Sequence, residues 1–262
     1  MSAYDILLSR GVTRLCHFTK LQSLTHIISS EQGVLASGSI CQDTKNANDT
    51  ARYDGELDFV CCSVEYPNSW FLKSARSSNY DSIFNDWTVL YIYLDILKEK
   101  RIKFSPCNAS RGRGAYINED EDEIESIFFN SDRYPRTPQM LPACPTDGQA
   151  EILIADNIPR RFIKGIALGN EDVAKRVYAM LKMCDMTHIP LYIAPDVLTP
   201  NWSPLIKSGR RPEKIPCVWP EEGSVCRYQA EWKNVKELCW VPRSATPWDG
   251  PTSLALKIGK SV

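Results

Sequence analysis

Residues 146–154 place a turn directly before a short apolar strand, with a carboxylate at the junction between them. The turn formers at residues 145–148 (Pro-Thr-Asp-Gly) lead into a β-branched run, and Glu151 stands where the polar segment ends. Because residues two apart on a strand project from the same face, we expect Gln149 and Glu151 to face one space. The segment therefore predicts a strand that presents an amide and a carboxylate together at its start.

This pair suits chemistry at the anomeric carbon of a sugar. The transition state there is an oxocarbenium-like sugar, which a carboxylate stabilises while an amide reads hydrogen bonds. A Gln-x-Glu pair also occurs at ordinary solvent-facing strand starts, and the chain repeats the tripeptide at residues 229–231. That copy is followed by Trp-Lys-Asn-Val-Lys-Glu, which favours a helix or an exposed edge. We therefore expect residues 149–151, and not the second copy, to belong to a site.

Strands and helices are interspersed along the first two thirds of the chain without a regular order. Apolar, β-branched runs predict strands over residues 15–19, 59–64, 87–94, 103–105, 151–154 and 162–168. Helical spacing of apolar residues predicts helices over residues 21–28, from residue 70, and over 171–183. The acidic run over residues 118–125 is typical of a solvated loop or helix start. Since neither a βαβ alternation nor a glycine-rich phosphate loop is found, the pattern favours an α+β fold.

The character of the chain changes near residue 186. Proline and tryptophan recur throughout residues 186–262, where proline interrupts regular elements and tryptophan favours burial. Such a segment is too aromatic for a disordered tail, so we expect an ordered, irregular extension. We therefore divide the chain into a catalytic domain over residues 1–185 and a Pro/Trp-rich extension over residues 186–262. The extension is expected to lie against that domain or to dock a partner.

Charge and cysteine usage limit the class of protein. The 31 Lys and Arg residues are balanced by 32 Asp and Glu residues, so no bulk positive charge indicates a long nucleic-acid footprint. The ten cysteines form no C-x-x-C motif and no metal-site spacing with histidine, so we expect no bound metal. We see neither a signal peptide nor an apolar run of membrane-spanning length, and expect a reduced, cytoplasmic protein that does not bind membranes.

Four motifs occur in order along the chain. They are Leu-Cys-His-Phe-Thr at residues 15–19, Ala-Arg-Tyr-Asp-Gly at 51–55 ahead of the strand over 59–64, Phe-Ser-Pro-Cys-Asn-Ala-Ser at 104–110, and Pro-Thr-Asp-Gly-Gln-Ala-Glu at 145–151. With this set the chain resembles the DarT-type nucleic-acid ADP-ribosyltransferases, the toxins of bacterial toxin–antitoxin pairs. The resemblance covers residues 12–185, and residues after 186 resemble nothing in the family.

The resemblance implies an ADP-ribosyltransferase fold, in which two small packed β-sheets with flanking helices surround a cleft for NAD. It implies NAD-dependent transfer of ADP-ribose to a base of single-stranded nucleic acid, with DNA favoured over RNA. NAD is then the co-substrate, and the enzyme acts as a toxin in a toxin–antitoxin or phage-defence system. A cognate antitoxin, or a chaperone, is the protein partner that this role implies.

The resemblance also implies the site residues. Glu151 is expected to stabilise the oxocarbenium ion, Gln149 to read the target base, and Arg52 to clamp the pyrophosphate of NAD. His17 and Thr19 are expected to hold a ribose or the nicotinamide amide. The further candidates are Ser63, Asn68, Trp70 and Phe71 for NAD, and Asn108, Arg111 and Arg113 for the nucleic acid.

Each candidate also has a structural interpretation. A histidine within an apolar strand, such as His17, is commonly a core residue, and arginines in polar loops are commonly solvated. Trp70 and Phe71 at a helix start suit the core, although an aromatic ring there could stack on nicotinamide or on a flipped base. Two other functions stay open. One is an ADP-ribosyltransferase acting on protein, which the balanced charge favours slightly, and the other is a non-enzymatic module whose extension docks partners.

Overall fold

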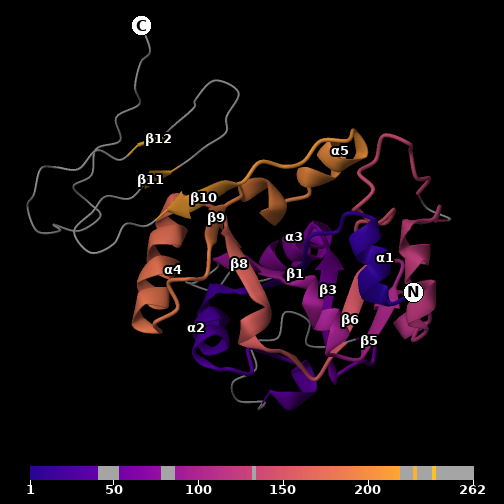
Figure 1. Ribbon diagram of the computed structural model, residues 1–262, viewed down its shortest axis with the longest axis horizontal. Helices are drawn as coiled ribbons and strands as arrows, with labels where there is room; N and C mark the ends of the chain where they lie inside the picture. The colour runs from indigo at the N-terminus through magenta and orange to yellow at the C-terminus, as the bar shows by residue number, and fades with distance from the viewer. Residues whose placement is uncertain (41–52, 78–85, 132–133, 219–226, 229–237, 240–262) are drawn as a thin grey trace, which may run out of the picture.

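The computed structural model describes residues 1–40, 53–77, 86–131, 134–218, 227–228 and 238–239 (Figure 1). Within these ranges the α-helices are α1 (Ala3–Ser9), α2 (Leu21–Ser29), α3 (Ser69–Ser77), α4 (Glu171–Met183) and α5 (Trp202–Lys207). The 3₁₀ helices are η1 (Ser37–Ser39), η3 (Leu94–Lys98), η4 (Arg111–Gly114), η5 (Glu121–Phe128), η6 (Arg160–Phe162) and η7 (Pro195–Leu198). None of the helices in these ranges is both long and apolar enough to cross a membrane.

The strands are β1 (Leu15–Lys20), β2 (Val34–Leu35), β3 (Phe59–Val64), β4 (Trp87–Ile92), β5 (Ile102–Ser105), β6 (Glu151–Ala155), β7 (Asn157–Ile158), β8 (Ile163–Leu168), β9 (Leu191–Ile193), β10 (Ile215–Val218), β11 (Arg227–Tyr228) and β12 (Leu238–Cys239). Most of them form one large sheet in the order β12-β11-β10-β9-β8-β4-β1-β3-β6-β5, and β2 pairs separately with β7. The large sheet is mixed, because β8 and β9 run parallel while β4 and β8 run antiparallel. The α+β prediction is confirmed.

The arrangement of the strands differs from the expected pair of small packed sheets. Leu15 pairs with Val64 and Cys16 pairs with Ser63, so β1 and β3 are neighbours in the same sheet. This contact joins β4 and β8 on one side to β6 and β5 on the other. The expected second sheet is therefore a continuation of the first, and only the short β2–β7 pair stands apart.

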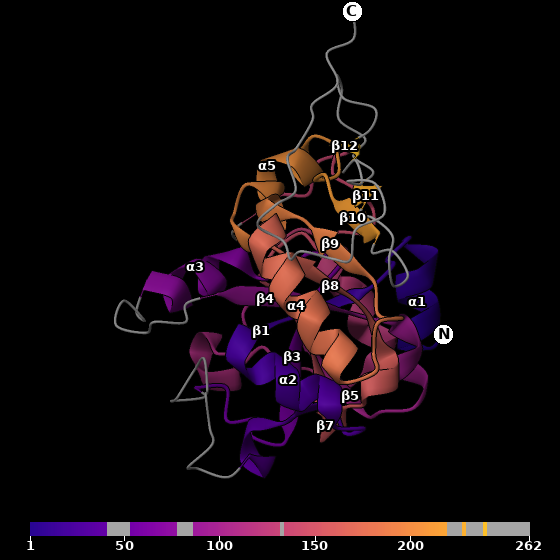
Figure 2. The ribbon, with the colours of Figure 1, turned by 90° about the vertical axis from the view of Figure 1, so that its left-hand side faces the viewer.

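Both faces of the large sheet are covered, and the central strand β4 shows how. All of its residues are buried: Leu90 and Ile92 belong to one apolar cluster, and Trp87, Val89 and Tyr91 belong to another. Helices α1, α2 and α4 contribute to the first cluster, whereas α3 and α5 contribute to the second. Figures 1 and 2 show α2 and α4 on the same side of the molecule. A strand that is apolar on both faces is therefore what this position requires.

The predicted elements lie close to the observed ones. Helix α4 has the predicted bounds, and the predicted strands agree with β1, β3, β5, β6 and β8 to within a residue or two. The strand predicted over residues 87–94 ends at Ile92, because the chain turns into η3 at Leu94. The acidic run begins η5, where the Asp120 carboxylate accepts a hydrogen bond from the backbone N–H of Asp122 at 3.1 Å.

The first part of the extension adds strands to the large sheet. Strand β9 pairs in parallel with β8, and β10 pairs antiparallel with β9. Trp202 in α5 is only 2% exposed, as expected for a tryptophan of this segment. The remaining tryptophans of the extension, Trp219, Trp232, Trp240 and Trp248, lie outside the described residues.

A buried carboxylate, Glu65, links the end of β3 to the segment before β1 and to the segment between α5 and β10. It has a positive φ of 62° and is fully buried. One carboxylate oxygen accepts a hydrogen bond from the backbone N–H of Thr13 at 2.7 Å, and the other lies 2.8 Å from Arg211 Nη1. The Arg14 guanidinium donates through Nε to the Glu65 carbonyl at 3.0 Å. Since a buried charge is costly unless it is paired, these contacts are what allow a carboxylate here.

Gly33, just after α2, provides a test of the fold next to the cavity described below. Its φ is +67°, and a Cβ atom there would lie 2.1 Å from the backbone oxygen of Ile158 in β7. We expect Gly33→Ala to lower the free energy of unfolding by about 3 kcal/mol or more, because backbone must move to admit the methyl group. Urea denaturation followed by circular dichroism measures the change.

Gly11→Ala is the matched control. Gly11 has a similar φ of +78°, but nothing lies within 4 Å of the position of a Cβ atom. Its substitution should therefore cost only the backbone strain, about 1–2 kcal/mol. Equal losses of stability in the two variants would contradict the close approach of β7 to Gly33.

Candidate functional site

The large sheet opens between β1 and β3. Strand β1 pairs with β4 along its whole length, from Leu15 to Lys20, but it pairs with β3 only at Leu15 and Cys16. Beyond Cys16 the two strands part, and His17 spans the gap with Nδ1 2.9 Å from the carbonyl oxygen of Cys61. Because a carbonyl oxygen only accepts hydrogen bonds, Nδ1 carries the proton, and the acceptor nitrogen of the neutral ring is Nε2.

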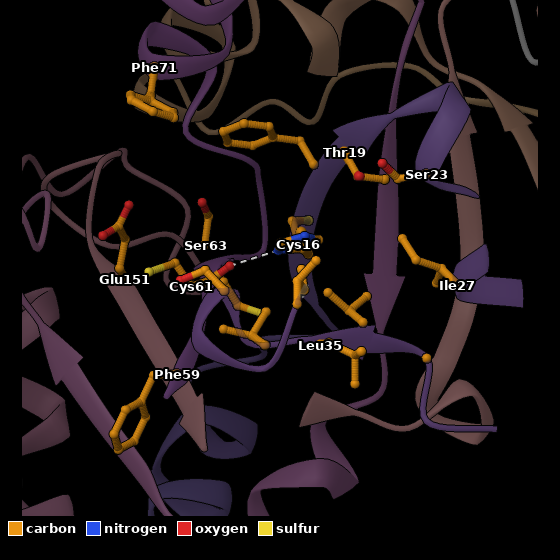
Figure 3. Close-up of a pocket in the computed structure, with 18 of the residues that line it drawn as sticks. Cys16, Thr19, Ser23, Ile27, Leu35, Phe59, Cys61, Ser63, Phe71 and Glu151 are labelled. Carbon is orange, nitrogen blue, oxygen red and sulfur yellow. Dashed lines mark hydrogen bonds between the residues drawn. The ribbon is translucent and has the colours of Figure 1, made fainter. Parts of the chain in front are cut away.

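A cavity of about 700 Å³ lies at this opening (Figure 3). That volume is in the range of sites for small molecules and cofactors. Its walls come from β1, from one side of α2, from the β2 region, and from β3 with Asp54 before it. Phe71 of α3, Asn108 and Ser110 of the β5–η4 loop and Glu151 of β6 complete it. The residues predicted from the sequence that line it are His17, Thr19, Ser63, Phe71, Asn108 and Glu151.

Glu151 is the carboxylate at the start of β6. It is half-buried, and it is paired in register with Ser63 of β3 on one side and with Ser105 of β5 on the other. Its Oε2 accepts a hydrogen bond from the backbone N–H of Ala109 at 2.9 Å. Two strands and a backbone donor therefore fix this carboxylate at the edge of the cavity.

The turn that supplies this donor is shaped by Asn108. The Asn108 side-chain oxygen accepts a hydrogen bond from the backbone N–H of Ser110 at 3.0 Å and another from the Ser110 hydroxyl. Ala109 between them is fully buried against Phe59 and Leu153. Asn108 thus lines the cavity and also holds the turn whose N–H reaches Glu151.

Ser63 and Asn68 determine how α3 approaches the cavity. The Ser63 hydroxyl accepts a hydrogen bond from the Asn68 N–H at 2.9 Å, and the Asn68 side-chain oxygen accepts one from the Phe71 N–H at 3.1 Å. Figure 3 shows the Glu151 carboxylate and the Ser63 hydroxyl projecting the same way from neighbouring strands, with Phe71 beyond them. Asn68 is 1% exposed and does not line the cavity, so its contacts place Phe71 there.

Other predicted residues lie away from the cavity wall. Strand β6 begins at Glu151, so Gln149 lies in the preceding turn and the expected shared strand face does not apply to it. Trp70 is 38% exposed and is not among the lining residues. Arg111 and Arg113 are exposed in η4, beyond the turn at Asn108. Arg52 lies outside the described residues.

The sequence interpretation missed the contribution of α2. Gln22, Ser23 and His26 line the cavity, and none of them was among the candidate residues. The signal was present, because polar residues three and four apart form one side of a helix whose other side is apolar. Phe18, which lies between the candidates His17 and Thr19, lines the cavity as well, and so does Cys61.

The cavity is lined mainly by uncharged polar groups and apolar side chains. Hydroxyl, amide and imidazole groups face it together with apolar side chains, and Glu151 and Asp54 bring carboxylates. Among the described residues that line it, none is Lys or Arg. Three or more His, Cys, Asp or Glu side chains in a metal-binding arrangement are not found in the part of the chain that the structure describes. The arrangement suits a ribose whose developing positive charge faces a carboxylate.

Three neighbouring thiols line the cavity but differ in their exposure to solvent. Burial raises the pKa of Cys16 to about 12 and raises the pKa of Cys62 well above its usual value, whereas Cys61 is only half-buried. A raised pKa keeps a thiol protonated, and only the thiolate reacts. At pH 8 we therefore expect iodoacetamide to modify Cys61 well before Cys16 or Cys62, as read by tandem mass spectrometry. Modification of all three at one rate would contradict this order.

Comparison with known proteins identifies the family. The sequence profile described as "ssDNA thymidine ADP-ribosyltransferase, DarT" matches residues 16–199. No curated protein matches the chain. Among solved structures, Thermus sp. 2.9 DarT in complex with ADP-ribosylated ssDNA is similar, with a TM-score of 0.53 and 17% identity, over 71% of this chain and 96% of that chain.

A second similar structure is Thermosipho africanus DarTG in complex with ADP-ribose. Its TM-score is 0.52 at 15% identity, and the match covers 71% of this chain and 51% of that chain. At such identities the two structures establish a shared fold only. The profile match spans more than half of the chain, from β1 through η7. The chain therefore belongs to the DarT family of single-stranded DNA thymidine ADP-ribosyltransferases.

Proposed function

We propose that Glu151 is the catalytic carboxylate with which this DarT-family enzyme transfers ADP-ribose from NAD to thymidine in single-stranded DNA. The observation that supports this role most directly is the position of the carboxylate. It lies at the edge of a cavity of about 700 Å³, with one oxygen held 2.9 Å from the Ala109 N–H. A carboxylate fixed in this way needs no reorganisation when positive charge develops beside it.

The chemistry places two demands on Glu151. NAD supplies the ADP-ribose group, and nicotinamide leaves as a neutral molecule when its bond to the ribose breaks. The anomeric carbon then carries oxocarbenium character, which the Glu151 carboxylate stabilises. An atom of the thymine base forms the new bond to that carbon, and the proton that the base loses passes to Glu151.

The remaining lining residues would orient the dinucleotide. His17 and Thr19 on β1 offer a ring nitrogen and a hydroxyl for the ribose or the nicotinamide amide, and Ser63 lies beside Glu151. Phe71 is an aromatic surface on which a planar ring can stack. A pyrophosphate calls for a cation that the described lining residues do not include. Arg52 is proposed for this contact, because Asp54, two residues later in the chain, lines the cavity.

The role in the cell follows from the family. The enzyme is the toxin of a DarTG toxin–antitoxin system. A cognate antitoxin is proposed as its partner, with a chaperone as the alternative, and the extension over residues 186–262 is proposed as a docking segment or as a cover of the catalytic domain. The family description favours thymidine in DNA over the RNA and protein targets that the sequence left open.

The Glu151 assignment is tested with Glu151→Gln, which removes the charge and keeps the shape. Transfer of labelled ADP-ribose to a thymidine-containing oligonucleotide should fall on the order of a thousandfold, because oxocarbenium stabilisation is lost. Glu231→Gln is the matched control, since it changes the same tripeptide elsewhere in the chain and should keep normal activity. Activity that survives in the first variant, or is lost in both, would refute the assignment.

The role of Gln149 is tested by comparing two activities of one variant. If its side chain reads the target base, Gln149→Ala should weaken transfer to DNA far more than it weakens slow hydrolysis of NAD by water. Both rates can be measured in one assay by separating modified oligonucleotide from free ADP-ribose. Equal losses would instead assign Gln149 to the NAD site.

A further inference from the structure

Two adjacent aromatic residues at the start of α3 face different surroundings. Phe71 lines the cavity, whereas Trp70 does not and is 38% exposed. Trp70 is therefore poorly placed to stack on nicotinamide, which the sequence had left open for it. Its exposed ring, beside the cavity, offers a stacking surface to a different ligand.

Trp202 of the extension holds the Trp70 ring in place. The two indoles meet edge to face, with centroids 5.5 Å apart and an interplanar angle of 76°. Trp202 is 2% exposed, donates its indole N–H to the Ser69 hydroxyl, and stacks on Tyr66 with centroids 5.4 Å apart. The Ser69 hydroxyl in turn donates to the carbonyl of Val197 at 3.1 Å. The ring that supports Trp70 is thus fixed on several sides.

The same two indoles lie against the loop that leads to the catalytic carboxylate. A Cβ atom on Gly148 would lie 2.9 Å from Trp202 and 2.9 Å from Trp70. Gly148 directly precedes Gln149, and Glu151 follows three residues later. The exposed indole of Trp70 is therefore in contact with the backbone that presents the residue proposed to read the target base.

We propose that Trp70 is a stacking surface for a base that neighbours the target thymidine in single-stranded DNA, and that Trp202 is its positioning residue. Bases of any sequence stack on an exposed aromatic ring, and such contacts are used where single strands are bound. Lys73 is exposed one helical turn after Trp70, on the same side of α3, where it would meet the phosphates of such a strand. This inference rests on the proposed function and names a part of its substrate site.

Trp70→Ala and Trp70→Phe test the stacking surface. In Trp70→Ala, KM for a single-thymidine oligonucleotide should rise on the order of tenfold, while hydrolysis of NAD without DNA stays unchanged. Trp70→Phe should retain most of the affinity, because a ring remains. Tyr93→Ala removes another exposed aromatic ring, 43% exposed, and should have no effect. An unchanged KM in Trp70→Ala, or an equal loss of NAD hydrolysis, would overturn the proposal.

An oligonucleotide with an abasic residue beside the thymidine separates this contact from a general loss of structure. The wild-type enzyme should bind the abasic strand about tenfold more weakly on one side of the thymidine. Trp70→Ala should bind the intact and abasic strands equally well. A variant that still distinguishes the two strands would refute the stacking contact. If the wild-type enzyme modified no DNA at all, the proposed function itself would fail.

Trp202→Phe tests the positioning role, since it removes the indole N–H that bonds to Ser69 but keeps an aromatic ring. It should raise KM for DNA several-fold with kcat and NAD hydrolysis preserved. In the Trp70→Ala background the same change should have no further effect on KM, because the ring that it positions is gone. Additive effects of the two substitutions would overturn the positioning role of Trp202.

Discussion

The site depends on the short contact between β1 and β3. Leu15 and Cys16 pair with Val64 and Ser63, and beyond them the strands diverge. With a longer ladder the sheet would stay closed and Glu151 would face a packed surface. Without any pairing between β1 and β3, the two parts of the sheet that carry His17 and Glu151 would not be held at a fixed position relative to each other. A hydrogen bond from His17 to the Cys61 carbonyl holds the opened strands at a defined separation.

Sequence periodicity predicted the helices and strands well because residues close together in the sequence determine each of them. Strand β4 is β-branched and aromatic throughout, and α4 has apolar residues at helical spacing, so neighbours in sequence specify them. The motif argument also led to His17, Ser63 and Glu151, which the fold brings to one cavity.

The sequence could not show which neighbours an element would have. That β3 continues the sheet of β1 depends on the pairing of Cys16 with Ser63, which are far apart in the chain. The contribution of α2 to the cavity depends on which of its sides faces the opening. Whether the side chains of Gln149 and Trp70 face the cavity depends on the exact residue at which a strand or helix begins. Such boundaries are the least reliable part of a prediction from sequence. Trp202 was expected to be buried, but its contact with Trp70 needs the tertiary structure.

The ion pair between Glu65 and Arg211 has a consequence for shortened forms of the protein. Glu65 directly follows β3, next to the residues that join β3 to β1, and its carboxylate is fully buried. A fragment that ends before Arg211 would leave that carboxylate without its cationic partner, close to the contact on which the cavity depends. A fragment for crystallisation or expression should therefore extend past Arg211, beyond the end of the matched family region at residue 199.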